Sequence, residues 1–330
     1  MTEPQTTAAP LLRVDDVSVH FPLPKRGLLG AREVVRAVDG VSFTIGAGEV
    51  LGLVGESGSG KSTTGRAVLR DVATASGTVE FDGRDVGDMR GASLRQYRRD
   101  VQIVFQDPYS SLNPRMRVGA ILAEPFQVHF RDMGKHEIEA RVTELLDDVG
   151  LGSRYADRHP HELSGGQRQR VGIARALALR PRLVIADEPV AALDVSTQAQ
   201  IVNLLQDLQE QHELAYLFVA HNLAVVRQIA DRIAIMYCGK LVELASRDDV
   251  FGAPQHPYTR ALLSAVPDID DRPGSRRNRI VLKGDTPSPV NPPAGCRFSS
   301  RCPQVVPRCT TEEPVLRDLG RGQWVACHVA

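Results

Sequence analysis

The residues best suited to chemistry lie in a glycine-rich stretch near the N-terminus. Residues 55–62 read Gly-Glu-Ser-Gly-Ser-Gly-Lys-Ser, which is the complete phosphate-loop pattern. Glycines let backbone N–H groups surround a phosphate, and a helix that starts there adds the positive end of its dipole. A flexible turn would also suit this composition, but the chain has only five lysines, and one of them falls at the required position. The predicted nucleotide-binding residues here are Gly55, Ser57, Gly58, Ser59, Gly60, Lys61, Ser62 and Thr63.

Lys61 and Ser62 have distinct expected roles in this loop. A lysine at this position reaches the β- and γ-phosphates of a nucleotide, and the serine that follows places its hydroxyl on Mg²⁺. ATP and Mg²⁺ are therefore the expected cofactors.

Two adjacent carboxylates follow an apolar run at residues 183–186. Asp187 suits the Mg²⁺ shell, through water, and Glu188 suits the base that orients and deprotonates an attacking water. Alone, the pair would be read as a solvated strand end. With a phosphate loop in the same predicted sheet the catalytic interpretation is favoured, because ligands bind at the carboxyl ends of parallel strands.

The elements that must position these groups alternate between strand and helix, which predicts an α/β fold with a parallel core. Residues 107–180 are mainly helical in pattern and predict an inserted subdomain. Predicted strands cover residues 11–21, 38–45, 50–54, 78–81, 101–105, 183–186, 216–220, 233–237 and 241–243, and predicted helices cover 61–69, 135–149, 166–179 and 198–209.

Charge and hydropathy narrow the functional class. The formal net charge is zero and no basic run occurs, so nucleic acid is not an expected partner. No apolar run approaches the roughly 20 residues that span a bilayer. The N-terminus lacks the basic flank and apolar core of a signal peptide. The expected location is the cytoplasm, or the cytoplasmic side of a membrane.

A third motif, Leu-Ser-Gly-Gly-Gln at residues 163–167, precedes a predicted helix. A simple N-cap would explain Ser164 but not Gly165, Gly166 or Gln167. The stretch resembles the signature of the ABC ATPase family, and the resemblance extends over residues 11–255. It implies a P-loop NTPase core with an antiparallel β subdomain and a helical subdomain.

The resemblance assigns roles to three further residues. It implies that Gln106 contacts Mg²⁺ and senses the γ-phosphate, that His221 contacts the γ-phosphate, and that Phe21 stacks on adenine. From the residues alone, a single Phe after a strand is more often a core residue, and a single His is usually structural. The family also implies that the signature of one subunit serves the ATP of its partner.

Four stretches resemble the dipeptide and oligopeptide importer branch, and in particular the second of its two ATPase subunits. They cover residues 105–114, 187–194, 256–259 and 284–285. The branch implies ATP hydrolysis that powers peptide import at the cytoplasmic face of the inner membrane. The implied partners are a second, homologous ATPase subunit, two transmembrane permeases that dock near residues 109–126, and an extracytoplasmic solute-binding protein.

Other functions stay open at this point. Nickel chelates or glycosides could replace peptides as the solute. The chain could also be an exporter subunit, a soluble ABC factor, a non-hydrolysing regulatory subunit or an iron–sulfur redox protein.

Residues 256–330 are predicted to form a separate module that contains four cysteines. Cys296, Cys302, Cys309 and Cys327 have five, six and seventeen residues between them, whereas zinc sites usually show closer pairs. Four thiolates could instead hold an iron–sulfur cluster. Relatives in the branch carry such a set, which implies a 4Fe-4S cluster, with zinc or free thiols as alternatives.

Overall fold

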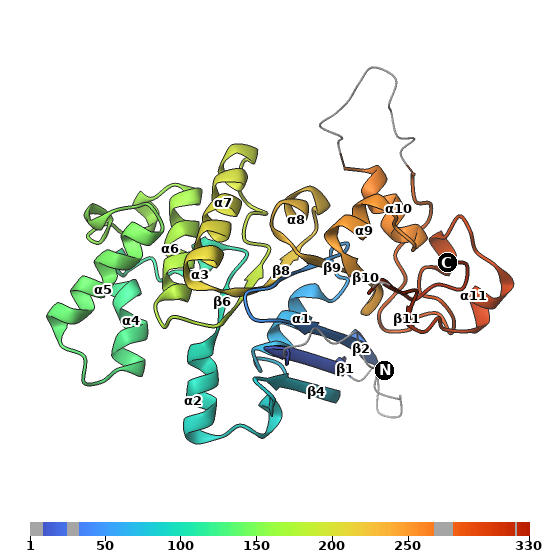
Figure 1. The fold of residues 1–330 in the computed structure, drawn as a ribbon, viewed down its shortest axis with the longest axis horizontal. Coiled ribbons are helices and arrows are strands. Elements are labelled where there is room, and N and C mark those ends of the chain that lie inside the picture. The colour runs from blue at the N-terminus through green and yellow to red at the C-terminus, as the bar shows by residue number, and fades with distance from the viewer. Residues whose placement is uncertain (1–8, 25–32, 267–279, 321) are drawn as a thin grey trace, which may run out of the picture. The chain divides into compact units, whose positions relative to one another are not determined.

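The computed structural model describes residues 9–24, 33–266, 280–320 and 322–330. The chain divides into two compact units. Unit 1 consists of Met1–Gly46, Val50–Gly87 and Ala220–Ala330, and unit 2 of Ala47–Glu49 and Asp88–Val219. The blue and the red ends of the chain both belong to unit 1 (Figure 1).

The first sheet of unit 1 is antiparallel, with its strands in the order β2-β1-β4-β5. In β1 (Leu12–Pro22), Leu12 lies opposite Ile45 on one side and Phe81 on the other. All three side chains are buried. A shift by one residue would expose them, so burial sets this register. The other strands are β2 (Val34–Ile45), β4 (Ser76–Phe81) and β5 (Arg84–Asp85).

The second sheet of unit 1 has the order β11-β12-β10-β9-β3 within this unit. The buried strand β3 (Val50–Val54) runs parallel to β9 (Arg232–Tyr237), and β10 (Lys240–Ser246) returns antiparallel to β9. Five helices of the unit are α1 (Lys61–Val68), α8 (Leu223–Ile229), α9 (Arg247–Gly252), α10 (Pro257–Ser264) and α11 (Pro307–Thr311).

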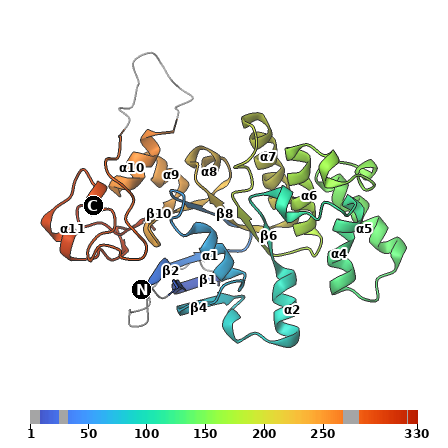
Figure 2. The ribbon, with the colours of Figure 1, turned by 180° about the vertical axis from the view of Figure 1, so that it is seen from behind.

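The end of the chain completes this second sheet. Strand β12 (Trp324–Val325) pairs with β10, Leu244 opposite Trp324, and also with β11 (Arg317–Asp318). Phe298 is buried just before a 3-10 turn at Ser299–Arg301. Both views show this red stretch beside β10 and α10 (Figures 1 and 2). We call residues 280–330 the C-terminal segment.

Unit 2 is built on three parallel strands in the order β8-β7-β6. They are β6 (Val101–Val104), β7 (Leu183–Asp187) and β8 (Ala215–Ala220). Helices α4, α5 and α6 pack against one another, as both views show (Figures 1 and 2). The helices are α2 (Gly91–Asp100), α3 (Pro108–Ser111), α4 (Val118–His129), α5 (Lys135–Asp148), α6 (Gly165–Leu177) and α7 (Val195–His212).

The predicted α/β fold with an antiparallel sheet and a helical insertion is confirmed. The prediction of a separate cysteine-containing module is not confirmed, because the C-terminal segment joins the sheet and the core of unit 1. The boundary at residue 255 stays a prediction.

Helix α2 is not predicted by the sequence, because Tyr97 is its one buried residue and its apolar periodicity is therefore weak. No helix in the described part of the chain is long and apolar enough to cross a membrane.

His256 anchors helix α10 from inside the core. Its side chain is 1% exposed, and its Nδ1 accepts a hydrogen bond from the Tyr258 backbone N–H at 3.0 Å. Its own backbone N–H donates to the buried carboxylate of Glu243 at 2.9 Å. Burial, together with the charge of Arg260, lowers the pKa of His256 to about 3. The imidazole is therefore neutral in the folded protein.

We expect His256 to make the stability of unit 1 depend on pH. The unfolded chain binds a proton at this residue below its ordinary pKa of about 6.5, and the folded chain does not until about pH 3. Stability therefore falls as pH falls through this window, by about 2 kcal/mol between pH 7 and pH 5.

The variant His256→Asn should lack this pH dependence while keeping the cap, because asparagine is a good N-cap residue. The free energy of unfolding is measured at pH 7 and pH 5 by urea unfolding, followed by the fluorescence of Trp324, the single tryptophan. Equal losses of stability in wild type and variant would contradict the assignment.

Candidate active site

The phosphate loop of unit 1 passes very close to two neighbouring backbones. A Cβ atom on Gly55 would lie 2.1 Å from the Met236 carbonyl oxygen, and one on Gly60 would lie 2.2 Å from that of Ala37. Gly60 also has φ +104°, which L-residues rarely adopt. Gly58, at φ +77°, has open space around its Cα instead. The loop therefore requires glycine at both ends and is open in its middle, which fits a phosphate.

Lys61 begins helix α1 and lies across the loop. It is 4% exposed, and its Nζ donates to the carbonyl oxygens of Gly55 and Glu56, both at 2.9 Å. The buried hydroxyl of Ser59 has no partner among the described residues. A cation and an unpaired hydroxyl within a ring of backbone amides form a donor set that suits phosphate.

Unit 2 brings together two of the predicted catalytic residues. Strands β6 and β7 are parallel neighbours with Val104 opposite Ala186, so the residues that follow them share one edge. There, Gln106 Nε2 donates to Glu188 Oε2 at 3.2 Å. Asp187 lies at the end of β7 and is 8% exposed. The oxygens of these three residues are ligands that Mg²⁺ prefers.

Glu188 has an unusual backbone conformation. Its φ is +46°, and its N–H donates to the Val219 carbonyl oxygen at 2.9 Å. A positive φ in a residue other than glycine costs free energy, and six other non-glycine residues in the described part of the chain also adopt one. The conformation is therefore not specific to functional residues, and the motif carries the assignment of Glu188.

The signature stretch in unit 2 forms a complete capping box. Ser164 Oγ accepts from the Gln167 N–H at 3.3 Å, and Gln167 Oε1 accepts from the Ser164 N–H at 2.9 Å. A Cβ atom on Gly166 would lie 2.5 Å from Thr197 Cγ2 of helix α7. Capping therefore accounts for Gln167 and packing for Gly166, neither of which a simple N-cap at Ser164 explains.

An open hollow of about 320 Å³ adjoins the signature residues. Its lining includes Ser164 and Gln167 as well as the cations Arg154 and Arg170. Nearby, Asp194 caps α7 through its carboxylate. Hydrogen bonds from the Ser196 hydroxyl and from Thr197 lower the pKa of Asp194 to about 2, so it is ionised at neutral pH.

The other predicted residues are placed as follows. His221 is exposed and follows β8, and Phe21 lies in β1 with 41% of its surface exposed. Both belong to unit 1, like the phosphate loop, whereas Gln106, Asp187, Glu188 and the signature belong to unit 2. Ser57, Ser62 and Thr63 lie in the loop or the first turn of α1. Their contacts with nucleotide stay predictions.

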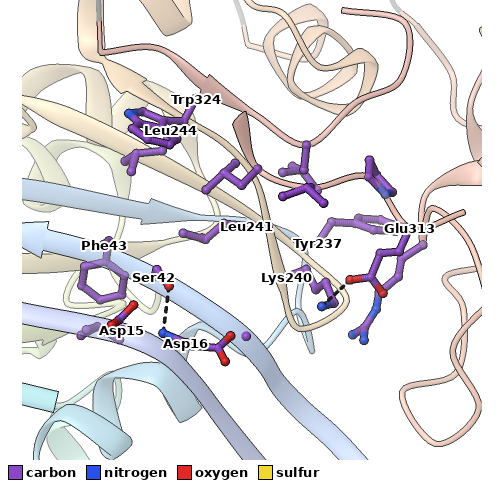
Figure 3. A pocket seen from close by; sticks show the side chains of 18 of the residues that line it. Asp15, Asp16, Ser42, Phe43, Tyr237, Lys240, Leu241, Leu244, Glu313 and Trp324 are labelled. Atoms are coloured by element: carbon purple, nitrogen blue, oxygen red, sulfur yellow. Dashed lines mark hydrogen bonds and ion pairs between the residues drawn. The ribbon is translucent and has the colours of Figure 1, made fainter. Parts of the chain in front are cut away.

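A cavity of about 380 Å³ in unit 1 is separate from this loop, since none of residues 55–62 lines it. It lies between β1, β2, β10 and the C-terminal segment (Figure 3). At its edge Lys240 and Glu313 form an ion pair at 2.5 Å. Its apolar lining includes Phe43, Leu244 and Trp324.

The prediction of an iron–sulfur or other metal site in the cysteine set was wrong. Among the described residues, no group of three or more His, Cys, Asp or Glu side chains is placed to hold a metal ion. Burial raises the pKa of Cys296 to about 11 and raises that of Cys302 as well, so both thiols are neutral at pH 7. The five cysteines are free. Strand pairing with β10 stabilises the segment in place of a metal.

Comparison with known proteins places the chain in a family. Residues 38–191 match the ABC transporter family, and residues 242–309 match the C-terminal region of oligopeptide/dipeptide transporters. The oligopeptide transport ATP-binding protein AppF of Bacillus subtilis is 50% identical, over 97% of each chain. The chain belongs to the oligopeptide/dipeptide branch of the ABC transporter ATP-binding proteins. It is an ABC-type ATPase, and ATP and Mg²⁺ are the cofactors of this class.

Further relatives agree with this placement. The probable peptide ABC transporter ATP-binding protein y4tS of Sinorhizobium fredii is 50% identical, over 97% of this chain and 90% of its own. The dimeric ATP-binding cassette MJ0796, in a post-hydrolysis state bound to ADP and Pi, superposes with a TM-score of 0.63. It is 31% identical and covers 72% of this chain and 98% of its own.

We expect Gly166→Ala to destabilise unit 2 through its collision with Thr197. A methyl group 2.5 Å from Thr197 Cγ2 forces a shift, which costs about 1–3 kcal/mol. The second change Thr197→Ser removes that methyl and keeps the hydroxyl that bonds Asp194 at 2.8 Å. The double variant should therefore recover most of the loss, as measured by chemical denaturation with circular dichroism.

Gly172→Ala is the matched control in the same helix, because a Cβ there meets nothing within 4 Å. It should leave stability unchanged or raise it by up to about 1 kcal/mol. If Gly166→Ala lost as much stability in the Thr197→Ser background as in the wild-type background, the packing explanation would be contradicted.

Proposed function

We propose that this ABC ATPase powers the import of peptides across the cytoplasmic membrane and works on its cytoplasmic face. The observation that carries the proposal is the match of residues 242–309 to the C-terminal region of oligopeptide/dipeptide transporters. Full-length similarity to relatives named for oligopeptide transport supports it. The partners would be two transmembrane permeases and an extracytoplasmic solute-binding protein.

Each predicted site residue has a proposed task. Lys61 and the loop amides bind the β- and γ-phosphates, and Ser62, Gln106 and Asp187 offer oxygens to Mg²⁺. When bound, this ion offsets the phosphate charge. Glu188 takes the proton of the attacking water, and Gln106, 3.2 Å from its carboxylate, holds that group in place. His221 contacts the γ-phosphate and Phe21 the adenine.

We further propose that the active form is a heterodimer with a second, homologous ATPase subunit. The capped N-terminus of α6 at Ser164 and the polar hollow beside it would face the ATP of the partner. Helix N-termini are suited to anions. The dimeric state of the related cassette MJ0796 is consistent with such an arrangement.

We expect Glu188→Gln to bind ATP with little change in affinity and to lose at least about 100-fold in kcat, since the amide cannot accept the proton. Binding is measured by titration calorimetry and turnover by phosphate release. Glu210→Gln, on the exposed face of α7, is the control and should retain full activity. Normal turnover in Glu188→Gln would exclude it as the base.

The partner proposal predicts cooperation between two different chains. Co-expression with the proposed second ATPase subunit and the two permeases should yield one complex. Its ATPase rate should rise when peptide-loaded binding protein is added. The chain alone should turn over ATP more slowly, because each site lacks the signature of its partner. An isolated chain with the full rate, and no association with the permeases, would favour a soluble ABC factor.

A further inference from the structure

Glu56, the second residue of the phosphate loop, is held by three residues from the far end of the chain. Its carboxylate Oε2 accepts from Arg301 Nη1 at 2.8 Å and from Thr286 Oγ1 at 3.2 Å. Its backbone N–H donates to the Tyr258 hydroxyl at 3.0 Å. All three partners lie within residues 242–309, the region shared with oligopeptide/dipeptide transporters, and all belong to unit 1.

The groups that hold Glu56 are themselves fixed by packing. The Arg301 side chain is 10% exposed, and its Nη1 also lies 3.3 Å from the Tyr237 hydroxyl. The ring of Tyr237 is 4.7 Å from that of Tyr258 and 5.2 Å from that of Phe298, between centroids. Tyr258 and Phe298 are almost fully buried. The Glu56 side chain is 31% exposed, so the ion pair is partly buried and is screened less than a fully exposed pair.

The other face of Glu56 belongs to the phosphate site. Its carbonyl oxygen accepts from Lys61 Nζ at 2.9 Å and from the Ser59 N–H at 3.2 Å. Glu56 thus connects the C-terminal region directly to the phosphate-binding lysine. A displacement of Glu56 would move the carbonyl that Lys61 contacts and the amides that follow it in the loop.

We infer that Arg301 is a positioning residue of the ATP site, which holds the phosphate loop in its binding geometry through the ion pair with Glu56. The C-terminal region thereby sets the affinity for ATP and not only the stability of the fold. The inference rests on the assignment of residues 55–62 as the ATP site. Preorganisation of this kind favours ground-state binding, so its loss should appear in KM and not in kcat.

The test replaces Arg301 with Met, which keeps the length and apolar packing of the side chain. In the full-length chain, Arg301→Met should weaken MgATP binding about ten-fold, as the loss of one charge-assisted hydrogen bond predicts. In the co-purified assembly it should raise KM for ATP similarly and leave kcat within about two-fold. Thr286→Val removes the second bond to Glu56 and a longer contact of 3.4 Å with Arg301 Nη1, and leaves the ion pair in place. It should raise KM about two- to three-fold.

A double-mutant cycle shows whether Arg301 acts through Glu56. Glu56→Gln should raise KM for ATP as much as Arg301→Met does. The double variant Arg301→Met with Glu56→Gln should have a KM no higher than that of either single variant. Arg308→Met is the control, because Arg308 pairs with Glu312 in the same segment, with side chains 61% and 54% exposed. Its KM should equal that of wild type.

The outcomes separate this inference from the function on which it rests. If wild type binds MgATP and Lys61→Ala does not, the site assignment holds. An unchanged KM in both Arg301→Met and Thr286→Val, or additive effects in the cycle, would then overturn the positioning role alone. If wild type fails to bind MgATP, or Lys61→Ala binds it normally, the site assignment itself fails.

Discussion

The phosphate loop lies against two backbone carbonyls, and this close approach is the constraint on which the site depends. Met236 in β9 and Ala37 in β2 leave no room for a side chain at Gly55 or Gly60. Both strands must therefore be in register before the loop can take its shape. The buried partners of β1 and the parallel pairing of β3 with β9 supply that register. The chemistry at Lys61 is thus a consequence of sheet packing.

The same packing links the loop to the end of the chain. Residues after 280 add β12 to the sheet and bury Phe298 against Tyr237 and Tyr258. The region that matches the C-terminal region of oligopeptide/dipeptide transporters is therefore part of unit 1. It contributes hydrogen-bonding groups to Glu56, whereas the described residues contain no group placed to hold the predicted metal cluster. Neutral, buried thiols are consistent with this structural role.

Unit 2 positions its groups by different means. Parallel strands deliver Gln106 and Glu188 to one edge, and a positive φ orients Glu188. Helix caps hold the remaining motifs, since Ser164 and Asp194 each accept a hydrogen bond from the first turn of the helix that follows them. Residues that a family pattern marks as functional can therefore carry structural tasks at the same time. The capping box at Ser164 orients the helix end that would face a partner.

The sequence by itself determined the phosphate loop, the carboxylate pair and the signature, because each is a contiguous motif whose chemistry depends on neighbouring residues. It also determined the α/β fold class, because strand and helix patterns alternate along the chain. It also located most strands, whose apolar patterns are local. It missed α2, which buries little, and the contacts of Glu56 with Tyr258, Thr286 and Arg301. Only the tertiary structure decided those contacts and showed that the cysteines are free thiols. Glu56 and Arg301 are 245 residues apart in the sequence, so no local sequence pattern predicts that they are in contact. Strand pairing and burial, which bring distant residues together, decide such contacts.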